Sequence, residues 1–476
     1  MKNLLYIDIA AKMEEAIRKG TYKAGDRLPS VRTLHRQQQV SIGTALQAYY
    51  RLLDKGVIVA KEKSGYFVKQ ISLTDAPLPK TIKPSLSVRE VQIDQLIQRL
   101  WKDSPAGHFV SFANALPDQQ LLPLNGIKRA LQHASRDPGA KYLSYEEPGG
   151  DISLRQAIAK RAFTWGGALN PEEIVITNGA TEAINLCLKA VTRPGDTVLI
   201  QTPCYYGTLQ SLEYLQLKAL AIPCDAVSGI RLEDLENACS KQRGKVKAIL
   251  LVSNFNNPNG ASLDSIRKRQ IAALARREKI PVIEDDLYGD VFLDGGRRPD
   301  TIHNYDTDGW VLLCSSFSKT LVPGFRIGWC APGRFHYEVQ RFKYMSNLVT
   351  PPVLQKAVCE MLRNGLYDRH LRVYRNTLNT NLSRTITVIQ QSFPDGTAFT
   401  RPKGGLVSWV ELPGNPDTAA LQEVAFRKGV AFAPGVLFSA TGAYKNYIRI
   451  SYANAWTKKT ENALKRLGQL CQATVY

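Results

Sequence analysis

The chain has 476 residues, of which 44% are hydrophobic and 22% are charged, and its formal net charge at pH 7 is +20. This length predicts two or three domains, and the composition is that of a globular protein able to bury large cores. No apolar run approaches the roughly 20 residues of a membrane helix, so we expect no membrane partner, whereas the positive charge favours a polyanionic one.

The eight cysteines stand singly, without a CxxC pair and without clustering near the six histidines. This pattern predicts neither a disulfide framework nor a metal site, and it favours a reducing compartment. The first twenty residues place apolar positions at helical spacing but lack the uninterrupted apolar centre of a signal peptide. We therefore expect a cytoplasmic protein whose cysteines are core thiols.

Residues 1–70 are predicted to form a self-contained domain. The predicted elements are a helix stopped by Gly20, a helix over Val31–Arg36 capped by Ser30, a third helix capped by Ser41 and ended by Gly56, and strands over Val57–Ala60 and Tyr66–Val68. We place Ile42 on the apolar face of the third helix. Three helices followed by a basic hairpin is the layout of a winged helix-turn-helix, whose third helix enters the major groove of DNA.

The order AGDRLPSVRTL…VSIGTALQAYYRLLDKGVIVAKEKSGYFV resembles the DNA-binding domain of GntR-type bacterial regulators. The resemblance implies contacts with double-stranded operator DNA by six side chains, namely Arg27, Ser30, Arg32, Ser41, Thr44 and Lys63. Ile42 stands where the family usually has an arginine, so one phosphate contact expected of the family is missing. The alternative is a small helical domain used for docking or dimerisation.

Residues 71–104 are predicted to be a linker with an amphipathic helix. The segment Thr74–Ser85 carries three prolines in twelve residues and no apolar periodicity, which is typical of a semi-extended spacer. The apolar positions Ile93, Leu96, Ile97, Leu100 and Trp101 follow at helical spacing. We expect this helix to pack on the next domain.

Residues 105–476 alternate predicted strands and helices, which indicates an α/β domain with a mostly parallel sheet and helices on both faces. The predicted strand–helix pairs are Ile174–Thr177 with Thr181–Val191, Val198–Gln201 with Tyr205–Leu215, and Ala248–Val252 with Leu263–Arg277, and two further strands are Pro281–Glu284 and Val311–Cys314. In an open parallel sheet, ligands bind beyond the carboxyl ends of the strands. The polar segments of this domain fall at those ends.

The segment Val311–Cys330 has the strongest chemical pattern. A buried strand leads into a Ser-rich turn over Ser315–Ser318, followed by Lys319 and, seven residues later, Arg326. An apolar strand end and a nearby arginine both lower the pKa of a lysine, and a neutral amine can bond covalently to an aldehyde cofactor. Ser316, Ser318 and Arg326 could hold a phosphate on that cofactor. The alternative is a surface lysine in a polar turn.

Further strand ends carry Asn178-Gly179-Ala180-Thr181, which opens a helix and so offers an anion site, the Thr202–Gly207 and Ser253–Gly260 turns, and Asp285 with Tyr288. Taken one by one, these segments have plainer readings. Tyr205 could be a core tyrosine, Asp285 a helix-capping carboxylate, and Arg449 near the C-terminus a surface arginine on an alternating strand.

The pattern SxSK followed by PGxRxG resembles the cofactor-lysine segment of fold-type I pyridoxal 5′-phosphate (PLP) enzymes, the aspartate-aminotransferase superfamily. The resemblance implies a seven-stranded, mostly parallel sheet, a small α+β subdomain over about residues 355–476, and PLP on Lys319. For the cofactor ring, it implies that Asp285 faces the pyridine nitrogen, that Tyr288 and Asn257 bond the phenolic oxygen, and that Tyr205 stacks on the ring. It implies that six residues hold the phosphate, namely Gly179, Ala180, Thr181, Ser316, Ser318 and Arg326. It also implies that Tyr145 reaches the neighbouring subunit's phosphate and that Arg449 binds an amino acid's carboxylate. Asn259 stands where the superfamily more often has Thr.

The domain order resembles one branch, the MocR/GabR-like GntR regulators, over essentially the whole chain except the linker. It implies a head-to-tail homodimer that binds DNA and senses an amino acid, an amine or a vitamin B6 form through PLP. The alternative function is a working aminotransferase that converts an amino acid to a 2-oxo acid. A scaffold with an empty PLP fold is disfavoured because so many ligand positions occur together.

Overall fold

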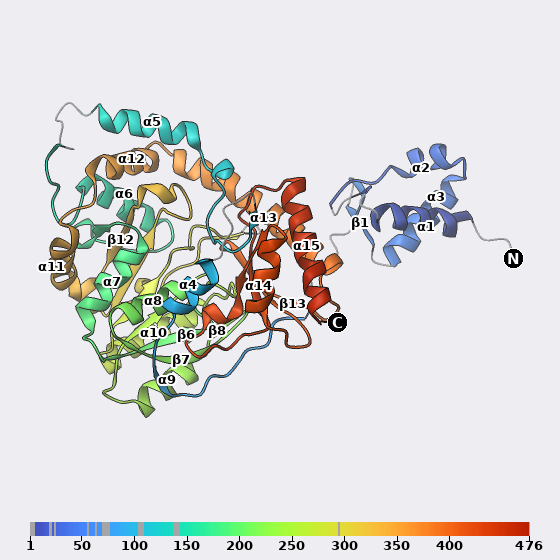
Figure 1. Cartoon of the computed structure of the whole chain (residues 1–476). Helices are drawn as coiled ribbons and strands as arrows, with labels where there is room; N and C mark the ends of the chain where they lie inside the picture. Colours follow the sequence, from blue (N-terminus) through green and yellow to red (C-terminus); the bar gives the residue numbers. More distant parts are fainter. Residues whose placement is uncertain are drawn as a thin grey trace. The chain divides into compact units, whose positions relative to one another are not determined.

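The computed structural model of the chain (Figure 1) describes residues 5–18, 21–22, 25–54, 57–61, 64–68, 77–102, 109–136, 143–293 and 296–475. The chain divides into two compact units, Met1–Ala76 and Pro77–Tyr476. Among the described helices, none combines the length and the apolar character that a membrane crossing requires.

The first unit contains three helices and a hairpin. Its elements are α1 (Leu5–Arg18), α2 (Val31–Gln38), α3 (Ile42–Asp54) and the antiparallel strands β1 (Ile58–Lys61) and β2 (Gly65–Val68). Ser30 caps α2 by accepting the Thr33 N–H at 3.1 Å, and Ser41 caps α3 by accepting the Thr44 N–H at 3.0 Å. The second helix extends two residues beyond the predicted end.

Apolar side chains from all three helices and the hairpin form the core of this unit, with Ile9, Leu34 and Tyr49 among its buried members. Tyr49 stacks on Tyr66 of the hairpin with ring centroids 4.3 Å apart. Ile42 does not belong to this core, because its side chain is 52% exposed. Our placement of Ile42 on the apolar face was wrong, since the first position after the Ser41 cap lies at the solvent side of the helix.

The second unit is built on a large sheet in the order β3-β7-β6-β9-β10-β11-β12-β5. The strands are β3 (Val88–Glu90), β5 (Val175–Thr177), β6 (Thr197–Thr202), β7 (Lys218–Asp225), β9 (Val246–Leu251), β10 (Val282–Asp285), β11 (Val311–Ser316) and β12 (Gly328–Ala331), with β8 (Gly229–Ile230) beside β7. Pairing from β7 to β11 is parallel, whereas β12 runs antiparallel to β11 and β5. The short connection from β11 to β12 explains the reversal, because a parallel crossover needs a dozen or more residues.

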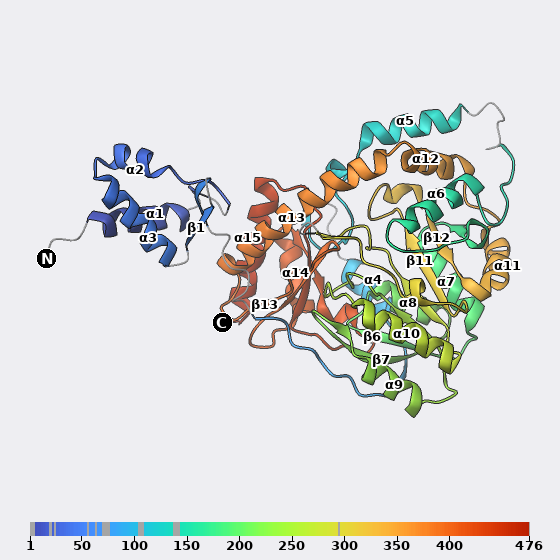
Figure 2. The same ribbon diagram turned by 180° about the vertical axis from the view of Figure 1, so that it is seen from behind.

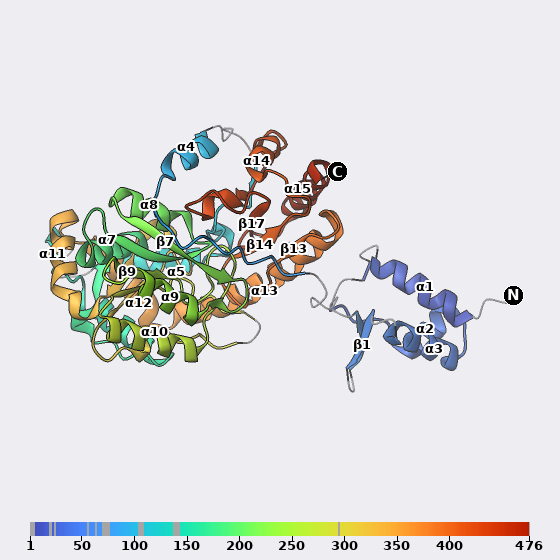
Figure 3. The same ribbon diagram turned by 90° about the horizontal axis from the view of Figure 1, so that it is seen from below.

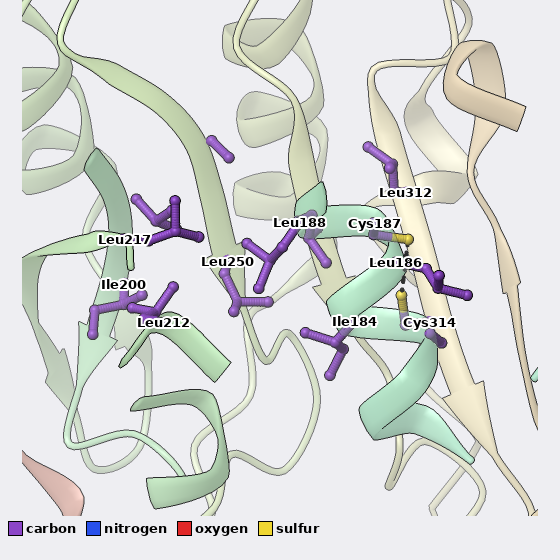
Figure 4. Close-up of a cluster of buried hydrophobic side chains, with 14 of the residues drawn as sticks. Ile184, Leu186, Cys187, Leu188, Ile200, Leu212, Leu217, Leu250, Leu312 and Cys314 are labelled. Atoms are coloured by element: carbon purple, nitrogen blue, oxygen red, sulfur yellow. Dashed lines mark hydrogen bonds between the residues drawn. The ribbon is translucent and has the colours of Figure 1, made fainter. Parts of the chain in front are cut away.

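Both faces of this sheet are buried. Alternate residues of β6 face opposite sides, so that Val198 and Ile200 join one apolar cluster and Leu199 joins another. The first cluster lies against α7 (Ala180–Val191) and α8 (Tyr206–Tyr214), and the second against α9 (Leu232–Lys241) and α10 (Ser265–Glu278). Figure 4 shows part of the first cluster, where Cys187 of α7 lies with its sulfur 3.6 Å from that of Cys314.

This arrangement confirms the predicted fold class of a mostly parallel sheet with helices on both faces. The predicted Ser-rich turn at Ser315 begins too early, because β11 continues through Ser316 and pairs with β12. The sequence analysis also did not predict β7 or β12. Pro223 obscured β7, since a proline argues against a central strand.

Helices surround the rest of the large sheet. They are α5 (Leu124–Ser135), α6 (Ile152–Phe163), α11 (His336–Asn347) and α12 (Pro352–Arg363), and α5 runs alongside α12 (Figures 1 and 2). The amphipathic helix α4 (Asp94–Lys102) lies over α8 (Figure 3). Glu213 of α8 accepts the Ile93 and Asp94 N–H groups at 2.6 and 3.0 Å, which caps α4.

The C-terminal part forms a smaller antiparallel sheet of β13 (Ala398–Phe399), β14 (Val407–Glu411), β17 (Tyr447–Ser451) and β16 (Ala433–Pro434), accompanied by α13 (Leu366–Ser392), α14 (Thr418–Arg427) and α15 (Lys458–Val475) (Figure 2). A separate pair joins distant parts of the chain, because β4 (Val110–Ser111) runs parallel to β15 (Val430–Ala431). This pairing brings the segment after β4 to the small sheet.

Candidate functional site

The carboxyl ends of β10 and β11 carry the central pair of residues. Parallel pairing aligns Asp285 with Cys314, so Asp285 ends β10 beside the strand that leads to Lys319. Lys319 follows the end of β11 by three residues. The charges of Asp285, Arg326 and Arg449 all act on the Lys319 amine, so the structure gathers these four predicted site residues in one neighbourhood.

The Lys319 side chain is half-buried, and its Nζ donates a hydrogen bond of 2.8 Å to the carbonyl oxygen of Ala115. Burial lowers the pKa of Lys319 to about 8, and the positive charges of Arg449 and Arg326 act in the same direction against the opposing charge of Asp285. At pH 7 roughly a tenth of this amine is therefore deprotonated, and this neutral fraction is the one that can act as a nucleophile.

Asp285 is buried, and its Oδ1 accepts the Leu287 N–H at 3.1 Å. Burial and the neighbouring charge of Asp286 raise the pKa of Asp285 to about 7, although Lys319 and the Leu287 N–H oppose the shift. A cation placed against this carboxylate would favour its ionised form. The protonated nitrogen of a pyridine ring fits that requirement.

Asp286 points to a different set of partners. It accepts the Asn254 side-chain amide at 2.8 Å and forms an ion pair with Arg298. The two neighbouring carboxylates therefore have different hydrogen-bond partners, since Asp285 accepts the Leu287 N–H.

The side chains of Tyr288, Asn257 and Arg449 form a continuous hydrogen-bonded group. Tyr288 bonds Asn257, and Arg449 Nη1 donates to Asn257 Oδ1 at 2.9 Å, while its Nη2 donates to the Ala113 carbonyl. Arg449 Nε has no hydrogen-bond partner among the described residues. We expected Arg449 to point outward, but the structure buries it fully on β17, near the Phe438 ring. A buried donor without a partner is well suited to an anionic ligand.

The start of α7 and the β11–β12 connection meet around Arg326. Its Nη1 donates to Ser318 Oγ and its Nη2 to the Asn178 carbonyl, both at 3.1 Å. Gly179 has φ +87°, and a Cβ there would lie 2.2 Å from Arg326 Nη2. The helix N-terminus, the guanidinium and the hydroxyls make a cradle that fits a phosphate group.

The remaining predicted phosphate residues lie around this cradle. Ser316 Oγ donates to the Ile327 carbonyl at 3.0 Å and accepts the Ser318 N–H at 3.0 Å. Ala180 is the first residue of α7, and Thr181 follows it with an exposed side chain. Their backbone N–H groups have no acceptor within the helix, as in any first helical turn.

Two predicted aromatic residues differ in their positions. Tyr205 is half-buried beside Tyr206, with ring centroids 4.6 Å apart, and the charge of Arg449 acts on its hydroxyl. Tyr145 is 83% exposed, and the single chain does not bring it to the Lys319 neighbourhood. In the described part of the chain, no group of three or more His, Cys, Asp or Glu side chains is placed to hold a metal ion.

In the first unit, five of the six predicted DNA contacts are described. Arg27, Ser30, Arg32 and Ser41 are exposed, and Thr44 is half-buried on the first turn of α3. The two serine hydroxyls also serve as helix caps, so their availability to DNA is limited to the remaining lone pairs and the hydroxyl proton. Lys63 lies outside the described residues.

The sequence analysis missed the contribution of the segment after β4. The carbonyls of Ala113 and Ala115 accept from Arg449 and Lys319, respectively. No side-chain pattern could have identified them, because every residue carries a carbonyl. The pairing of β4 with β15 is what places this segment in the site.

Comparison with known proteins agrees with this division. Residues 112–467 match the family described as Aminotransferase class I and II, and residues 5–68 match the Bacterial regulatory proteins, gntR family. The chain is 37% identical over 465 residues to the uncharacterized HTH-type transcriptional regulator YjiR of Escherichia coli, covering 98% of both chains. It is 38% identical over 469 residues to YdcR of the same organism, described in the same terms, covering 98% of this chain and 99% of YdcR.

Two solved structures show the same fold in the second unit. The multiple substrate aminotransferase of Thermococcus profundus has a TM-score of 0.73 at 27% identity, with 79% of this chain and 94% of that chain covered. The α-aminoadipate aminotransferase LysN of Thermus thermophilus, in complex with N-(5′-phosphopyridoxyl)-L-leucine, has a TM-score of 0.71 at 28% identity and the same coverage.

Proposed function

Because the chain belongs to the aminotransferase class I and II family and is an HTH-type regulator with a GntR DNA-binding domain, we propose that it holds PLP on Lys319 and uses it to sense an effector. The effector is an amino acid, an amine or a vitamin B6 form. One observation carries the proposal: Lys319, with its pKa lowered to about 8, lies within the electrostatic reach of Asp285, Arg326 and Arg449.

PLP, when bound, supplies an aldehyde that reacts with primary amines and a pyridine ring that withdraws electrons. Lys319 Nζ must first lose its proton and leave the Ala115 carbonyl. Asp285 would keep a proton on the ring nitrogen, and the Arg326 guanidinium, Ser318 and the first N–H groups of α7 would bind the phosphate. Tyr288 and Asn257 orient the phenolic oxygen.

Arg449 is the proposed partner of an effector carboxylate. Its buried Nε has no partner to give up, whereas its Nη2 must leave the Ala113 carbonyl to bind a second oxygen. An effector that engages both Lys319 and Arg449 would therefore release both contacts to the segment after β4. Because the Phe112 carbonyl, in the same segment, accepts the Ser451 N–H of β17, this release would bias the position of the small sheet relative to the large one.

The proposed assembly is a head-to-tail homodimer that binds operator DNA in the cytoplasm. The exposed Tyr145 supports it, since a large aromatic residue with 83% exposure is available to a second subunit's phosphate site. In the first unit, exposed Arg27 and Arg32 support contacts to DNA phosphates. A dimer presents two such units to two operator half-sites.

A second candidate function is catalysis of full transamination. The observation that favours it is the presence in one crevice of an amine, a carboxylate and a carboxylate-binding arginine, Lys319, Asp285 and Arg449. The regulator and the enzyme differ in turnover. A regulator needs only effector-dependent chemistry once per binding event, whereas an enzyme regenerates the starting state with a 2-oxo acid.

The test uses the visible absorption spectrum of the full chain with PLP, titrated with a panel of amino acids, amines and B6 forms. Borohydride reduction should fix the cofactor to Lys319, and one effector should change both the spectrum and the DNA footprint. Sustained turnover with a 2-oxo acid and an unchanged footprint would favour the enzyme. A chain that stays colourless after PLP and borohydride would contradict both functions.

A further inference from the structure

An ion pair between a buried lysine and a partly buried glutamate lies at the start of α7, beside the proposed phosphate cradle, and has no role in the function described so far. Glu182 lies in the first turn of α7, and its Oε2 accepts the Asn178 N–H at 2.5 Å. Lys343, from α11, is fully buried, and its Nζ lies 3.3 Å from the same oxygen. Lys343 also donates to Asn347 Oδ1 at 2.7 Å and to Thr350 Oγ1 at 3.0 Å, so all three of its N–H bonds have partners.

The position of Glu182 creates an electrostatic conflict. Its carboxylate fixes the backbone at Asn178, one residue before the Gly179 N-cap of α7. The same turn offers its next N–H groups, from Gly179 onward, to a phosphate. A carboxylate in this turn repels a dianion bound to the same turn, because the two charges have the same sign.

Lys343 resolves this conflict through its charge. Its ammonium is on the carboxylate of Glu182, and complete burial means that water does not screen it. Burial lowers the pKa of Lys343, while Glu182 acts to keep the amine charged. The pair as a whole is neutral, so the cradle keeps the backbone geometry that Glu182 imposes without a net negative charge.

We propose that Lys343 is a positioning residue for phosphate binding, acting through Glu182 as the counter-ion that makes this helix N-terminus accept a phosphate dianion. The inference rests on the proposed function, since the phosphate is that of PLP. Lys343 touches neither the cradle atoms nor Lys319 in the contacts described above. Its effect is therefore expected on ligands that carry the phosphate and not on the ring or the aldehyde.

The test measures the equilibrium affinity of the full-length apoprotein for PLP and for pyridoxal, which lacks the phosphate. In Lys343→Met, the Glu182 carboxylate keeps the Asn178 N–H and the Asn347 amide as donors but loses its counter-cation. The affinity for PLP should then fall roughly tenfold or more, and the affinity for pyridoxal should stay within about twofold. In Glu182→Gln, the cation remains without the anion, so the affinity for PLP relative to pyridoxal should rise. The double variant should return close to the wild-type ratio.

The opposite signs separate charge from structure. A purely structural clamp between α7 and α11 would make both single variants bind both ligands more weakly, and that result would overturn the proposal. Should Lys343→Met fail to fold, Glu182→Gln alone tests the proposal. An affinity for PLP relative to pyridoxal that is unchanged or lowered in Glu182→Gln would contradict the proposal. Lys268→Met is the matched control, since Lys268 of α10 is also buried and forms an ion pair with Asp300 at 2.9 Å. The affinity of this variant for PLP relative to pyridoxal should not change.

Measurements on the wild-type chain distinguish a failure of the proposed function from a failure of the proposed role of Lys343. A wild-type protein that binds no PLP contradicts the proposed function as well. A wild-type protein that binds PLP more tightly than pyridoxal, with variants that leave this ratio unchanged, contradicts only the role of Lys343.

Discussion

The Lys319 amine and the Ala115 carbonyl are joined by a hydrogen bond of 2.8 Å across 204 positions of the chain. This bond fixes the position of the amine against the segment after β4. An attack by Lys319 Nζ on an aldehyde needs a neutral amine that can turn toward the aldehyde carbon, so the amine must lose a proton and also turn away from the Ala115 carbonyl. The chemistry of the site is thereby tied to the conformation of the segment after β4.

The covalent attachment of PLP should depend on pH with a midpoint of about 8. The neutral fraction of Lys319 rises with pH up to its lowered pKa, so the attachment rate should increase about tenfold per pH unit below the midpoint and level off above it. Stopped-flow absorbance measures the rate. Lys319→Ala should form no adduct that borohydride can fix, and a rate without pH dependence between about 6 and 8 would refute the assigned pKa.

Arg449→Met should move that midpoint upward. Arg449 lowers the pKa of Lys319 by its positive charge, so removing the charge raises the pKa and leaves less neutral amine at pH 7. The same variant should lower the affinity for a carboxylate-bearing effector roughly tenfold or more, because the bidentate partner of the carboxylate is lost. An amine effector without a carboxylate is the control ligand, and equal weakening of both would argue against a carboxylate site.

Asp285→Asn should leave PLP attached but slow its reaction with an amino acid by roughly a hundredfold or more. The amide cannot carry the negative charge that keeps a ring nitrogen protonated, although it keeps the size of the side chain. Single-turnover spectra measure the rate. A variant that reacts as fast as the wild type would remove Asp285 from the proposed site.

Gly179→Ala should disturb the phosphate cradle. A Cβ at this position collides with Arg326, and φ +87° adds backbone strain of about 1–2 kcal/mol. Gly195→Ala is the matched control, because Gly195 has φ +91° but open space around the added Cβ. Chemical denaturation should show similar strain in both variants, whereas only Gly179→Ala should lose PLP affinity; parallel losses in the two would exclude a specific role for the cradle.

Ile42→Arg should strengthen operator binding. The side chain of Ile42 is 52% exposed at the first position of α3, so an arginine there can reach a DNA phosphate without disturbing the core. One added phosphate contact increases the slope of log affinity against log salt by about one. Ile42→Gln serves as the uncharged control, and an equal slope for the Arg and Gln variants would place α3 away from the DNA backbone.

The sequence by itself was enough for the elements with strong local signals. The caps Ser30 and Ser41 determine where α2 and α3 begin. Short apolar runs that alternate with helical patterns predicted most central strands and the helices after them. The resemblance at Lys319, Asp285 and Arg326 depends on short spacings within single strand–loop segments. These spacings do not depend on how distant parts of the chain pack. Such signals act over a few residues.

Tertiary structure alone decided what surrounds those residues. The pairing of β4 with β15, the backbone contacts of Ala113 and Ala115, and the ion pair of Lys343 with Glu182 join positions more than 150 residues apart. Contacts of this kind use carbonyl groups that every residue has, or charged side chains that look like ordinary surface residues in the sequence. Packing of distant segments removes water from them, and the loss of water is what turns them into parts of a site.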